Sequence, residues 1–376
     1  MPTVTIVFLV FNRREELQTS LTRMLEDSDF PAELVDVVVV DNASEDGSAE
    51  MVAEVFPQVQ VIRREVNCGV SGWNDGFAVA RGDYVLALDD DCYLPPDGLR
   101  HAVDAAQQHD ADLVSFSVRS LQRPEFRFTD AYITGLLAFW GCAVLVRRPA
   151  LERLRGYDPE IFVWANELEF MLRFFDHGFR HLHLPEVIAV HMKDPGDEHW
   201  TRIVRHPSYR INAQHFMYIA AKLLRPRDAL GAVVAVATMV LREGIQVDPV
   251  ALKALPPAGK GLLHGIRHRK SPVSADVSHA YRCNFHSFAS PWWFARPLPE
   301  LVRSLPGELT RRVAGHHVTK PPGRRDQYFS ERGAFYPASA ATLEFSLTGA
   351  DKDRGAAPPP GGRRAVRARR WRRRAA

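Results

Sequence analysis

The sequence predicts an α/β fold with a doubly wound sheet, and three observations support this prediction. Residues 4–10 and 35–40 are short runs rich in β-branched side chains, apolar except at Thr5 and Asp36. Strands that helices cover on both faces have this composition, because neither face meets water. The strand-helix-strand order then continues to residue 88, and polar residues follow three of the expected strands. In doubly wound sheets ligands bind at the carboxyl ends of the strands, so these polar residues predict a site.

The first half of the chain alternates expected strands and helices. After the first run, residues 15–25 form an amphipathic pattern that predicts a helix before the second run. Further helices are expected at 48–56, 71–80, 95–108, 149–154 and 165–177. Further strands are expected at 59–63, 84–88, 112–118, 141–146, 180–183 and 187–191, and residues 122–134 are expected to be an aromatic loop.

Changes in composition predict three parts of the chain. Residues 1–220 form the α/β core, and residues 221–349 form a mainly helical and irregular region. Two helices, 209–224 and 227–242, are expected to meet at Pro226, whereas the proline- and glycine-rich residues from 246 onward have no predicted fold. Residues 350–376 have the composition of a disordered, arginine-rich tail.

Charge and cysteine content exclude several classes of protein. The net charge of +3 depends on eight arginines between Arg363 and Arg374, so the rest of the chain is mildly acidic and binding to nucleic acid is not expected. The four cysteines are widely spaced, which argues against disulfides and structural zinc.

No secretion signal precedes the first strand, and the apolar run 229–241 is too short to span a bilayer. We therefore expect a cytoplasmic protein. Its basic tail offers a peripheral contact with anionic lipids on the cytoplasmic face of the membrane, and a solvated tail is the alternative.

The residues Asp89, Asp90 and Asp91 place three carboxylates directly after an apolar strand. Like charges this close together destabilise a fold unless a cation compensates them, and Mg²⁺ and Mn²⁺ prefer oxygen ligands. One or two carboxylates together with substrate phosphates is a common Mg²⁺ arrangement, so the triplet predicts a metal site for a diphosphate-bearing substrate. The alternative is an acidic turn that caps the following helix.

Four segments carry a resemblance to a known family. They are residues 4–13, 38–48, 67–76 and 80–91. In this order and spacing they resemble family-2 glycosyltransferases with the GT-A fold, a Rossmann-like mixed sheet, and in particular the rhamnosyltransferase type. The resemblance implies Mg²⁺- or Mn²⁺-dependent, inverting transfer of a sugar from a UDP-, dTDP- or GDP-sugar to an acceptor hydroxyl. The acceptor is a glycan, a lipid-linked glycan or a small secondary metabolite.

The resemblance also implies roles for individual residues. Asp91 is the leading metal ligand, Asp89 lies by the ribose or the metal, and His191 meets the metal or the diphosphate. Residues implied in nucleotide-sugar binding are Phe11, Asn12, Arg13, Asp41, Asn67, Gly72, Asn74, Asp89, Asp90 and Arg210. Residues implied on the acceptor side are Trp140, Gly141 and Asn166. The alternatives are a turn cap for Asp41, turn and helix-start roles for residues 67–74, and a core position for Trp140.

Glu167 is the candidate catalytic base. It stands in the segment 164–170, where the family carries an acidic pair, although Asn166 occupies a position that is commonly an acid. Transfer needs a base that takes the proton of the acceptor hydroxyl. Glu169 lies about 200° further around a helix and is not expected to share a face with Glu167. The alternative is a solvated helix start that favours acids through the helix dipole.

Three other functions compete with sugar transfer. A non-catalytic nucleotide-sugar-binding or scaffold protein would explain the Asn166-Glu167 pair. A sugar nucleotidyltransferase would need a glycine-rich, basic loop after the first strand, which 11–15 does not supply. A P-loop NTPase would need GxxxxGK[ST], and 258–261 is only a distant approach to it. His181 and His183 share one strand face, but no third ligand stands at a spacing typical of a zinc site.

Overall fold

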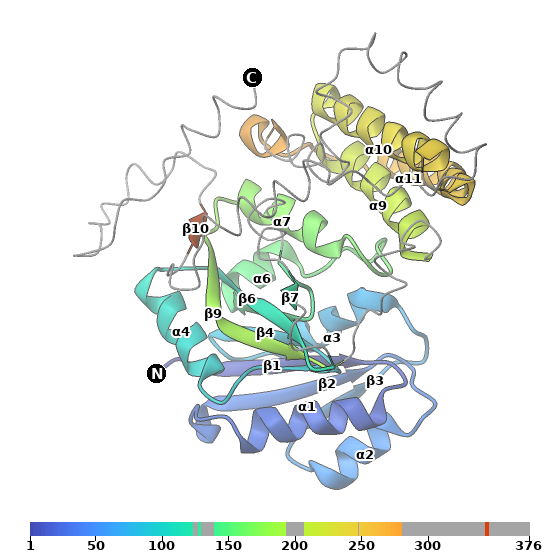
Figure 1. The fold of residues 1–376 in the computed structure, drawn as a ribbon. Coiled ribbons are helices and arrows are strands. Elements are labelled where there is room, and N and C mark those ends of the chain that lie inside the picture. The colour runs from blue at the N-terminus through green and yellow to red at the C-terminus, as the bar shows by residue number, and fades with distance from the viewer. Residues whose placement is uncertain (123–126, 129–138, 193–206, 247, 280–342, 346–376) are drawn as a thin grey trace.

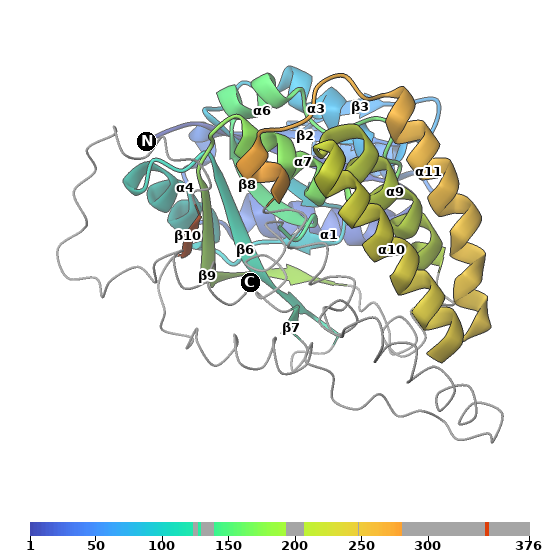
Figure 2. The ribbon, with the colours of Figure 1, turned by 90° about the horizontal axis from the view of Figure 1, so that it is seen from above.

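The computed structural model describes residues 1–122, 127–128, 139–192, 207–246, 248–279 and 343–345. A twisted sheet lies at the centre of the first half, with helices on both faces, and a group of three longer helices lies beside it (Figures 1 and 2). The expected arginine-rich tail, most of the expected loop 122–134 and the region 280–342 lie outside the described residues.

The N-terminal half follows the predicted order of strands and helices. Its strands are β1 (Val4–Val10), β2 (Val35–Asp41), β3 (Gln60–Arg63), β4 (Tyr84–Asp89) and β5 (Cys92–Tyr93). Its helices are α1 (Arg14–Glu26), α2 (Ser48–Val55), α3 (Trp73–Val79) and α4 (Gly98–Gln108). Short 3-10 turns, η1 (Ala32–Leu34) and η2 (Gly69–Gly72), precede β2 and α3. The predicted helix at 71–80 is therefore split between η2 and α3.

The second half completes the sheet with strands that run in both directions. These strands are β6 (Leu113–Ser120), β7 (Arg127–Phe128), β8 (Ala143–Arg147), β9 (His181–His191) and β10 (Leu343–Phe345). The helices α6 (Arg148–Leu154) and α7 (Asn166–Asp176) lie between β8 and β9. The two strands expected at 180–183 and 187–191 are one strand, because β9 continues through Pro185 with a shift of register against β6.

The sheet is mixed, in the order β10-β9-β6-β8-β4-β1-β2-β3. β1 pairs in parallel with both β2 and β4, and in this register Val10 lies opposite Asp41 and Leu9 opposite Asp89. β8 runs antiparallel to β4 and to β6. The polar residues that follow β1, β2 and β4 are thereby held at one edge of the sheet, as the sequence predicts.

Alternate residues of the central strands enter two separate cores. On one face, Val7, Val38 and Val85 pack with residues of α6, α7 and α9. On the other face, Phe8, Val39 and Leu86 pack with residues of α1, α2 and α4. Apart from Thr5, Asp36 and the acids at the strand ends, these strands are apolar because both faces are covered, which fixes the register of the strand ends.

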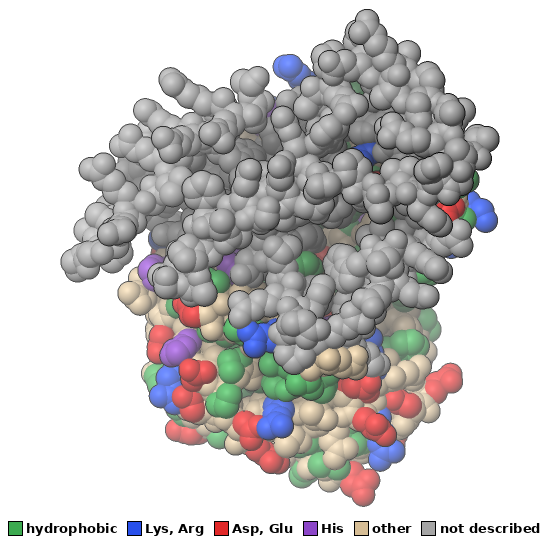
Figure 3. All heavy atoms as spheres, in the orientation of Figure 1, with side chains coloured by type: hydrophobic (Ala, Val, Ile, Leu, Met, Phe, Trp, Pro, Cys, Tyr) green, Lys and Arg blue, Asp and Glu red, His purple; other side chains and the backbone are tan. Residues whose placement is uncertain are grey.

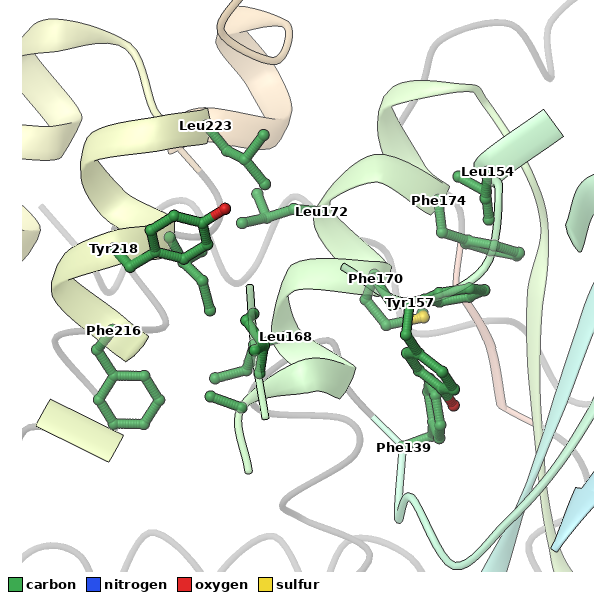
Figure 4. Packing of buried hydrophobic residues seen from close by; sticks show 14 of the residues in the cluster. Phe139, Leu154, Tyr157, Leu168, Phe170, Leu172, Phe174, Phe216, Tyr218 and Leu223 are labelled. Atoms are coloured by element: carbon green, nitrogen blue, oxygen red, sulfur yellow. The ribbon is translucent and has the colours of Figure 1, made fainter. Parts of the chain in front are cut away.

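Three helices form the part of the structure that follows the sheet. They are α9 (Pro207–Leu223), α10 (Pro226–Gln246) and α11 (Leu255–Arg267), with a 3-10 helix η3 (Pro249–Ala254) between the last two. α10 and α11 lie along α9 (Figure 2), and α9 packs on α7 through Leu168, Leu172, Phe216, Tyr218 and Leu223 (Figure 4). The helices expected at 209–224 and 227–242 are confirmed. The predicted boundary at 220/221 falls inside α9.

The helix α11 lies in a segment rich in glycine and proline, for which the sequence predicted no fold. Its prolines occupy the first turn, where no backbone N–H is needed. Gly261 and Gly265 face α9 so closely that a Cβ would lie 1.9 Å from the carbonyl oxygen of Gln214 and 2.4 Å from that of Tyr218. Both glycines therefore allow α11 and α9 to pack closely, and neither forms a turn.

The described surface around α1 and α2 mixes acidic, basic and apolar side chains (Figure 3). Among the described helices none is both long and apolar enough to cross a membrane. Contact of the tail with lipid stays a prediction.

Replacing Gly261 by alanine should destabilise the protein, whereas replacing Gly259 should stabilise it. The methyl group at 261 forces α11 away from α9, at a cost of roughly 1–3 kcal/mol. Gly259 lies on the same helix with nothing within 4 Å of an added Cβ, so alanine there gains about 0.5–1 kcal/mol of helix propensity. Urea unfolding measures both variants, and equal effects would contradict the close packing of α11 on α9.

Candidate active site

The acidic triplet lies at the end of β4, beside the ends of β1 and β2. Asp89 is the last residue of β4, and Asp90 and Asp91 form the turn that leads into β5. Asp91 is fully buried and Asp90 nearly so. β5 pairs with β9 so that Cys92 lies opposite His191, which brings the last residue of β9 next to the triplet.

Asp89, Asp91 and His191 form a cluster suited to a divalent cation. One ligand atom from each residue lies within 4.8 Å of the other two. The Nε2 atom of His191 is 3.4 Å from Oδ1 of Asp91. That oxygen is buried and accepts no hydrogen bond from the described residues. A buried carboxylate oxygen without a donor is costly, and a cation coordinated by these three residues would satisfy it.

Charge at the cluster is compensated from one side by Arg13, which follows β1. Its guanidinium is 2.9 Å from Oδ1 of Asp90 and 2.5 Å from Oδ2 of Asp91. Burial raises the pKa of Asp90 to about 7 even though Arg13 opposes the shift. Burial also raises the pKa of Asp89, and the neighbouring Asp91 adds to this rise. One arginine therefore does not compensate three acids, and the cluster favours further positive charge.

Asp90 differs from its neighbours because protein groups already occupy its oxygens. The backbone N–H of Phe11 donates to Oδ2 at 3.3 Å, and Arg13 binds Oδ1. The hydroxyl of Ser20 donates to its carbonyl oxygen at 2.9 Å. Asp90 therefore ties the loop after β1 to the end of β4, and the sequence pattern does not reveal this use.

The ends of β1 and β2 are joined to the loop 67–69 by amide side chains. Asp41 is buried and accepts a hydrogen bond from the Ser44 N–H at 2.9 Å, the turn cap that the sequence offered as an alternative. Asn42 donates to Oδ1 of Asn67 at 2.8 Å and to the carbonyl of Gly69 at 3.1 Å. Asn42 was not among the predicted site residues. Its position one residue after a strand-end acid was the only signal for it.

Three further predicted residues take structural contacts in this region. Asn12 has a left-handed backbone (φ 52°), and its side chain accepts from the Glu45 N–H at 2.8 Å. A Cβ at Gly72 would lie 2.5 Å from Leu9, so glycine allows η2 to approach β1. Asn74 uses both ends of its amide on the backbone of Tyr157, at 2.9 and 2.8 Å.

Glu167 lies in the first turn of α7, after two residues with unusual backbone angles. Trp164 (φ 61°) and Ala165 (φ 63°) are both left-handed, which is costly for residues other than glycine and recurs at functional sites. A Cβ on Gly141 would lie 2.3 Å from Oε1 of Glu167, so only glycine leaves room for this carboxylate.

The environment of Glu167 raises its pKa to about 7. Burial causes the rise, and hydrogen bonds from the backbone of Glu167 and Gly141 oppose it. The charge of Glu167 in turn contributes to the raised pKa of Asp89, so the two carboxylates lie in one electrostatic environment. Tyr157 also belongs to it: burial, then Glu167 and Asp89, raise the pKa of its phenol. A carboxyl with a pKa near neutrality is suited to accept a proton.

Glu169 points away from Glu167, as helix geometry predicts. It is buried and paired with Arg173 at 2.6 Å, with Lys222 of α9 at 3.4 Å. Asn166 is buried at the start of α7.

The remaining predicted residues are less closely tied to the cluster. Trp140 is partly buried beside the core below β1, and Arg210 is exposed on α9. His181 and His183 are both fully buried and share the hydroxyl of Ser115, at 2.7 and 3.0 Å. Burial lowers the pKa of His181 to about 3. Both imidazoles thus lie in the buried core beside Ser115.

Comparisons with known proteins agree with this geometry. Residues 5–172 match the family model described as glycosyl transferase family 2. The succinoglycan biosynthesis protein ExoO of Rhizobium meliloti is 32% identical over 131 residues, which cover 32% of this chain and 37% of that protein. An undecaprenyl-phosphate 4-deoxy-4-formamido-L-arabinose transferase of Aeromonas hydrophila is 30% identical over 131 residues, covering 34% and 40%. The matched region thus spans well under half the length of both relatives.

A solved structure supports the fold. Residues 1–349 of TarS from Staphylococcus aureus superpose with a TM-score of 0.51 at 15% identity, covering 79% of this chain and 93% of that one. The mixed sheet of this chain, which the superposition matches, is the GT-A arrangement. Residues 5–172 of this chain are therefore similar to glycosyl transferase family 2, and the chain has the GT-A fold.

Proposed function

We propose that this protein transfers one sugar from a nucleoside diphosphate sugar to an acceptor hydroxyl, with inversion at the anomeric carbon. The observation that carries the proposal is the convergence of Asp89, Asp91 and His191 in a cluster whose electrostatic environment includes Glu167. The cluster fits Mg²⁺ or Mn²⁺ because its ligands are two carboxylates and an imidazole and because Oδ1 of Asp91 has no donor. When bound, the ion offsets the negative charge of the leaving diphosphate.

The donor is proposed to lie along the strand ends. Asp41 is the candidate contact for the base, and Arg13 offers the phosphates a guanidinium that is partly exposed. TarS, a neighbour with the same fold, has been solved in complex with UDP-GlcNAc, which supports a nucleotide sugar as the donor class. A UDP-, dTDP- or GDP-sugar all fit this proposal, and the rhamnosyltransferase type stays a prediction.

Phe11, Asn12, Asn67, Gly72 and Asn74 are proposed to shape the nucleotide pocket through the loops that they order. The side chains of Asn12, Asn67 and Asn74 bond backbone groups, which supports this indirect role. The Phe11 N–H donates to Asp90, and Gly72 allows η2 to approach β1.

Glu167 is proposed to take the proton of the acceptor hydroxyl as its oxygen attacks the anomeric carbon. The bond from that carbon to the diphosphate oxygen breaks on the opposite face, and the nucleoside diphosphate leaves with the bonding electrons. Trp140, Gly141 and Asn166 are proposed to line the acceptor side, because Gly141 contacts Glu167 and Asn166 precedes it. Arg210 of α9 is the proposed additional cation for the diphosphate.

The acceptor class is proposed from the compounds for which three bacterial relatives are named. Their names specify undecaprenyl phosphate, succinoglycan and poly(ribitol-phosphate). A glycan or lipid-linked glycan is therefore the favoured acceptor, and a secondary metabolite is the alternative.

Metal and donor should stabilise the protein together. A donor present at about 100 times its Kd raises the free energy of unfolding by roughly 2.7 kcal/mol, because it binds only the folded state. We expect one of UDP-, GDP- or dTDP-sugars to raise Tm in the presence of Mn²⁺ and much less in EDTA. Thermal unfolding of the wild type measures this.

The Asp91→Asn variant should abolish the Mn²⁺-dependent part of the rise in Tm. Asp104→Asn, which changes an exposed acid on α4, serves as the control and should respond like the wild type. No response of the wild type to any donor would count heavily against a nucleotide-sugar site.

Replacing Glu167 by glutamine should lower kcat by about 10²–10⁴-fold, because the amide cannot accept the acceptor proton. Donor binding should be retained, since Glu167 is not a donor ligand in this proposal. Turnover assays with donor titration separate the two effects, and Glu152→Gln on the exposed face of α6 is the matched control. If the wild type binds donor but transfers no sugar to any acceptor, the non-catalytic scaffold is supported instead.

The transfer rate should rise with pH through about pH 7. Glu167 has a raised pKa, so it is protonated below this value and cannot act as a base; it becomes competent as pH rises through its pKa. The measurement is kcat at saturating donor, acceptor and Mn²⁺, with donor affinity followed over the same range. A rate that stays flat across neutrality while binding is constant would rule out Glu167 as the base.

A further inference from the structure

A second cluster of metal-ligating side chains lies where α11 meets the segment before α7. His264 and His268 are four residues apart on α11, and Glu160 precedes α7. The Nε2 atom of His264 is 2.6 Å from Oε2 of Glu160, and Nε2 of His268 is 3.8 Å from Oε1. One ligand atom from each residue lies within 4.8 Å of the other two. None of the three belongs to the site described above.

The residue types and their spacing suit a transition-metal ion such as Zn²⁺. Residues four apart on a helix share one face, and two histidines with one glutamate are a known zinc ligand set that leaves a fourth position for water. Ligands of a tetrahedral zinc with bonds of about 2.0–2.1 Å lie about 3.3 Å apart. Small side-chain rotations from the observed positions reach that spacing, since all three side chains are partly exposed (37–41%).

One histidine is already held in the form that binds metal. Nδ1 of His268 is 3.0 Å from the carbonyl oxygen of His264, so it carries the proton and donates it there. Its Nε2, the atom that faces Glu160, therefore has a free lone pair when the ring is neutral. In metal-binding histidines, the ring nitrogen that does not bind the metal typically donates such a hydrogen bond, which orients the ring.

The surroundings also favour a cation at this place. The ring of Tyr218 lies against both imidazoles, with centroids 5.2 and 6.3 Å away. Lys222, whose Nζ lies over the ring of Tyr218, is paired with Asp158 at 2.5 Å and with Glu169 at 3.4 Å. Its ion pairs are thus with acids other than Glu160.

We propose that Glu160, His264 and His268 bind a divalent ion of the Zn²⁺ class, which fastens α11 to the segment that leads to Glu167. Without metal, the same residues form an ordinary partly exposed contact between Glu160 and His264, and such surface pairs contribute little to stability. The proposal does not depend on the proposed sugar transfer, because it uses other residues and another class of ion.

Co²⁺ titration of the full-length protein tests the site, with the visible d–d absorption of Co²⁺ as the signal. The background is the Asp89→Asn/Asp91→Asn variant, in which the acidic cluster cannot contribute. We expect this background to bind one equivalent of Co²⁺, displaced by Zn²⁺, and His264→Gln and His268→Gln added to it to lose that equivalent. Glu160→Gln, which changes an exposed side chain, should weaken binding by about tenfold or more.

His101→Gln is the matched control. His101 is also a helical histidine near a carboxylate, Asp97 at 3.7 Å, but it has no second histidine beside it, so its loss should leave Co²⁺ binding unchanged. Unfolding in EDTA confirms that each variant is folded. The proposal is overturned if the background binds no Co²⁺, or if the Glu160 and histidine variants bind it as tightly as the background. Failure of sugar transfer in the wild type would leave this result unaffected.

Discussion

The repulsion among carboxylates at the end of β4 is the constraint on which the rest of the site depends. Ligand atoms of Asp89 and Asp91 lie within 4.8 Å of each other, and two unit charges at this distance or less repel by at least roughly 3 kcal/mol at an effective dielectric constant of about 20. Arg13 compensates one side of the cluster, and Oδ1 of Asp91 accepts no hydrogen bond from the part of the chain that the structure describes. The two cores hold the strands in one register, so the acids cannot move apart. The fold thus stores a charge imbalance that a divalent cation and a diphosphate relieve together.

The segment 157–165 connects this cluster with the helical part of the chain. Asn74 holds its first residue, the Val70 N–H donates to the carbonyl of Phe162 at 2.8 Å, and His215 of α9 bonds the carbonyl of Trp164 at 3.0 Å. The segment ends in two left-handed residues and presents Glu167. Loop 67–70, α9 and α11 therefore all contact the segment that supports the candidate base. This shared segment explains why the helices after the sheet pack closely against it.

Local pattern predicted the sheet and the acidic cluster, but not the contacts made over long sequence distances. A run of β-branched residues identifies a buried strand because the pattern lies within a few consecutive residues. The acidic triplet comes directly after such a run, so its place at the strand end could be predicted as well. The side chain of Asn74, which the resemblance assigns to nucleotide-sugar binding, bonds the backbone of Tyr157, 83 residues away, and spacing cannot show such a contact. The helix α11 was missed because its glycines and prolines, which usually break helices, occupy the first turn and a helix-helix contact.

The contrast between two glutamates of one helix turn explains how α7 provides a base. Glu169 is nearly fully buried, yet Arg173 and Lys222 offset its charge. Glu167, two residues earlier, faces the sheet, where only backbone groups oppose the effect of burial on its pKa. Arg173 and Lys222 thus lie on the side of α7 that carries Glu169. Among the described residues, no cation contributes to keeping Glu167 ionised, so burial raises its pKa toward neutrality. In this range a carboxylate can both accept and release a proton.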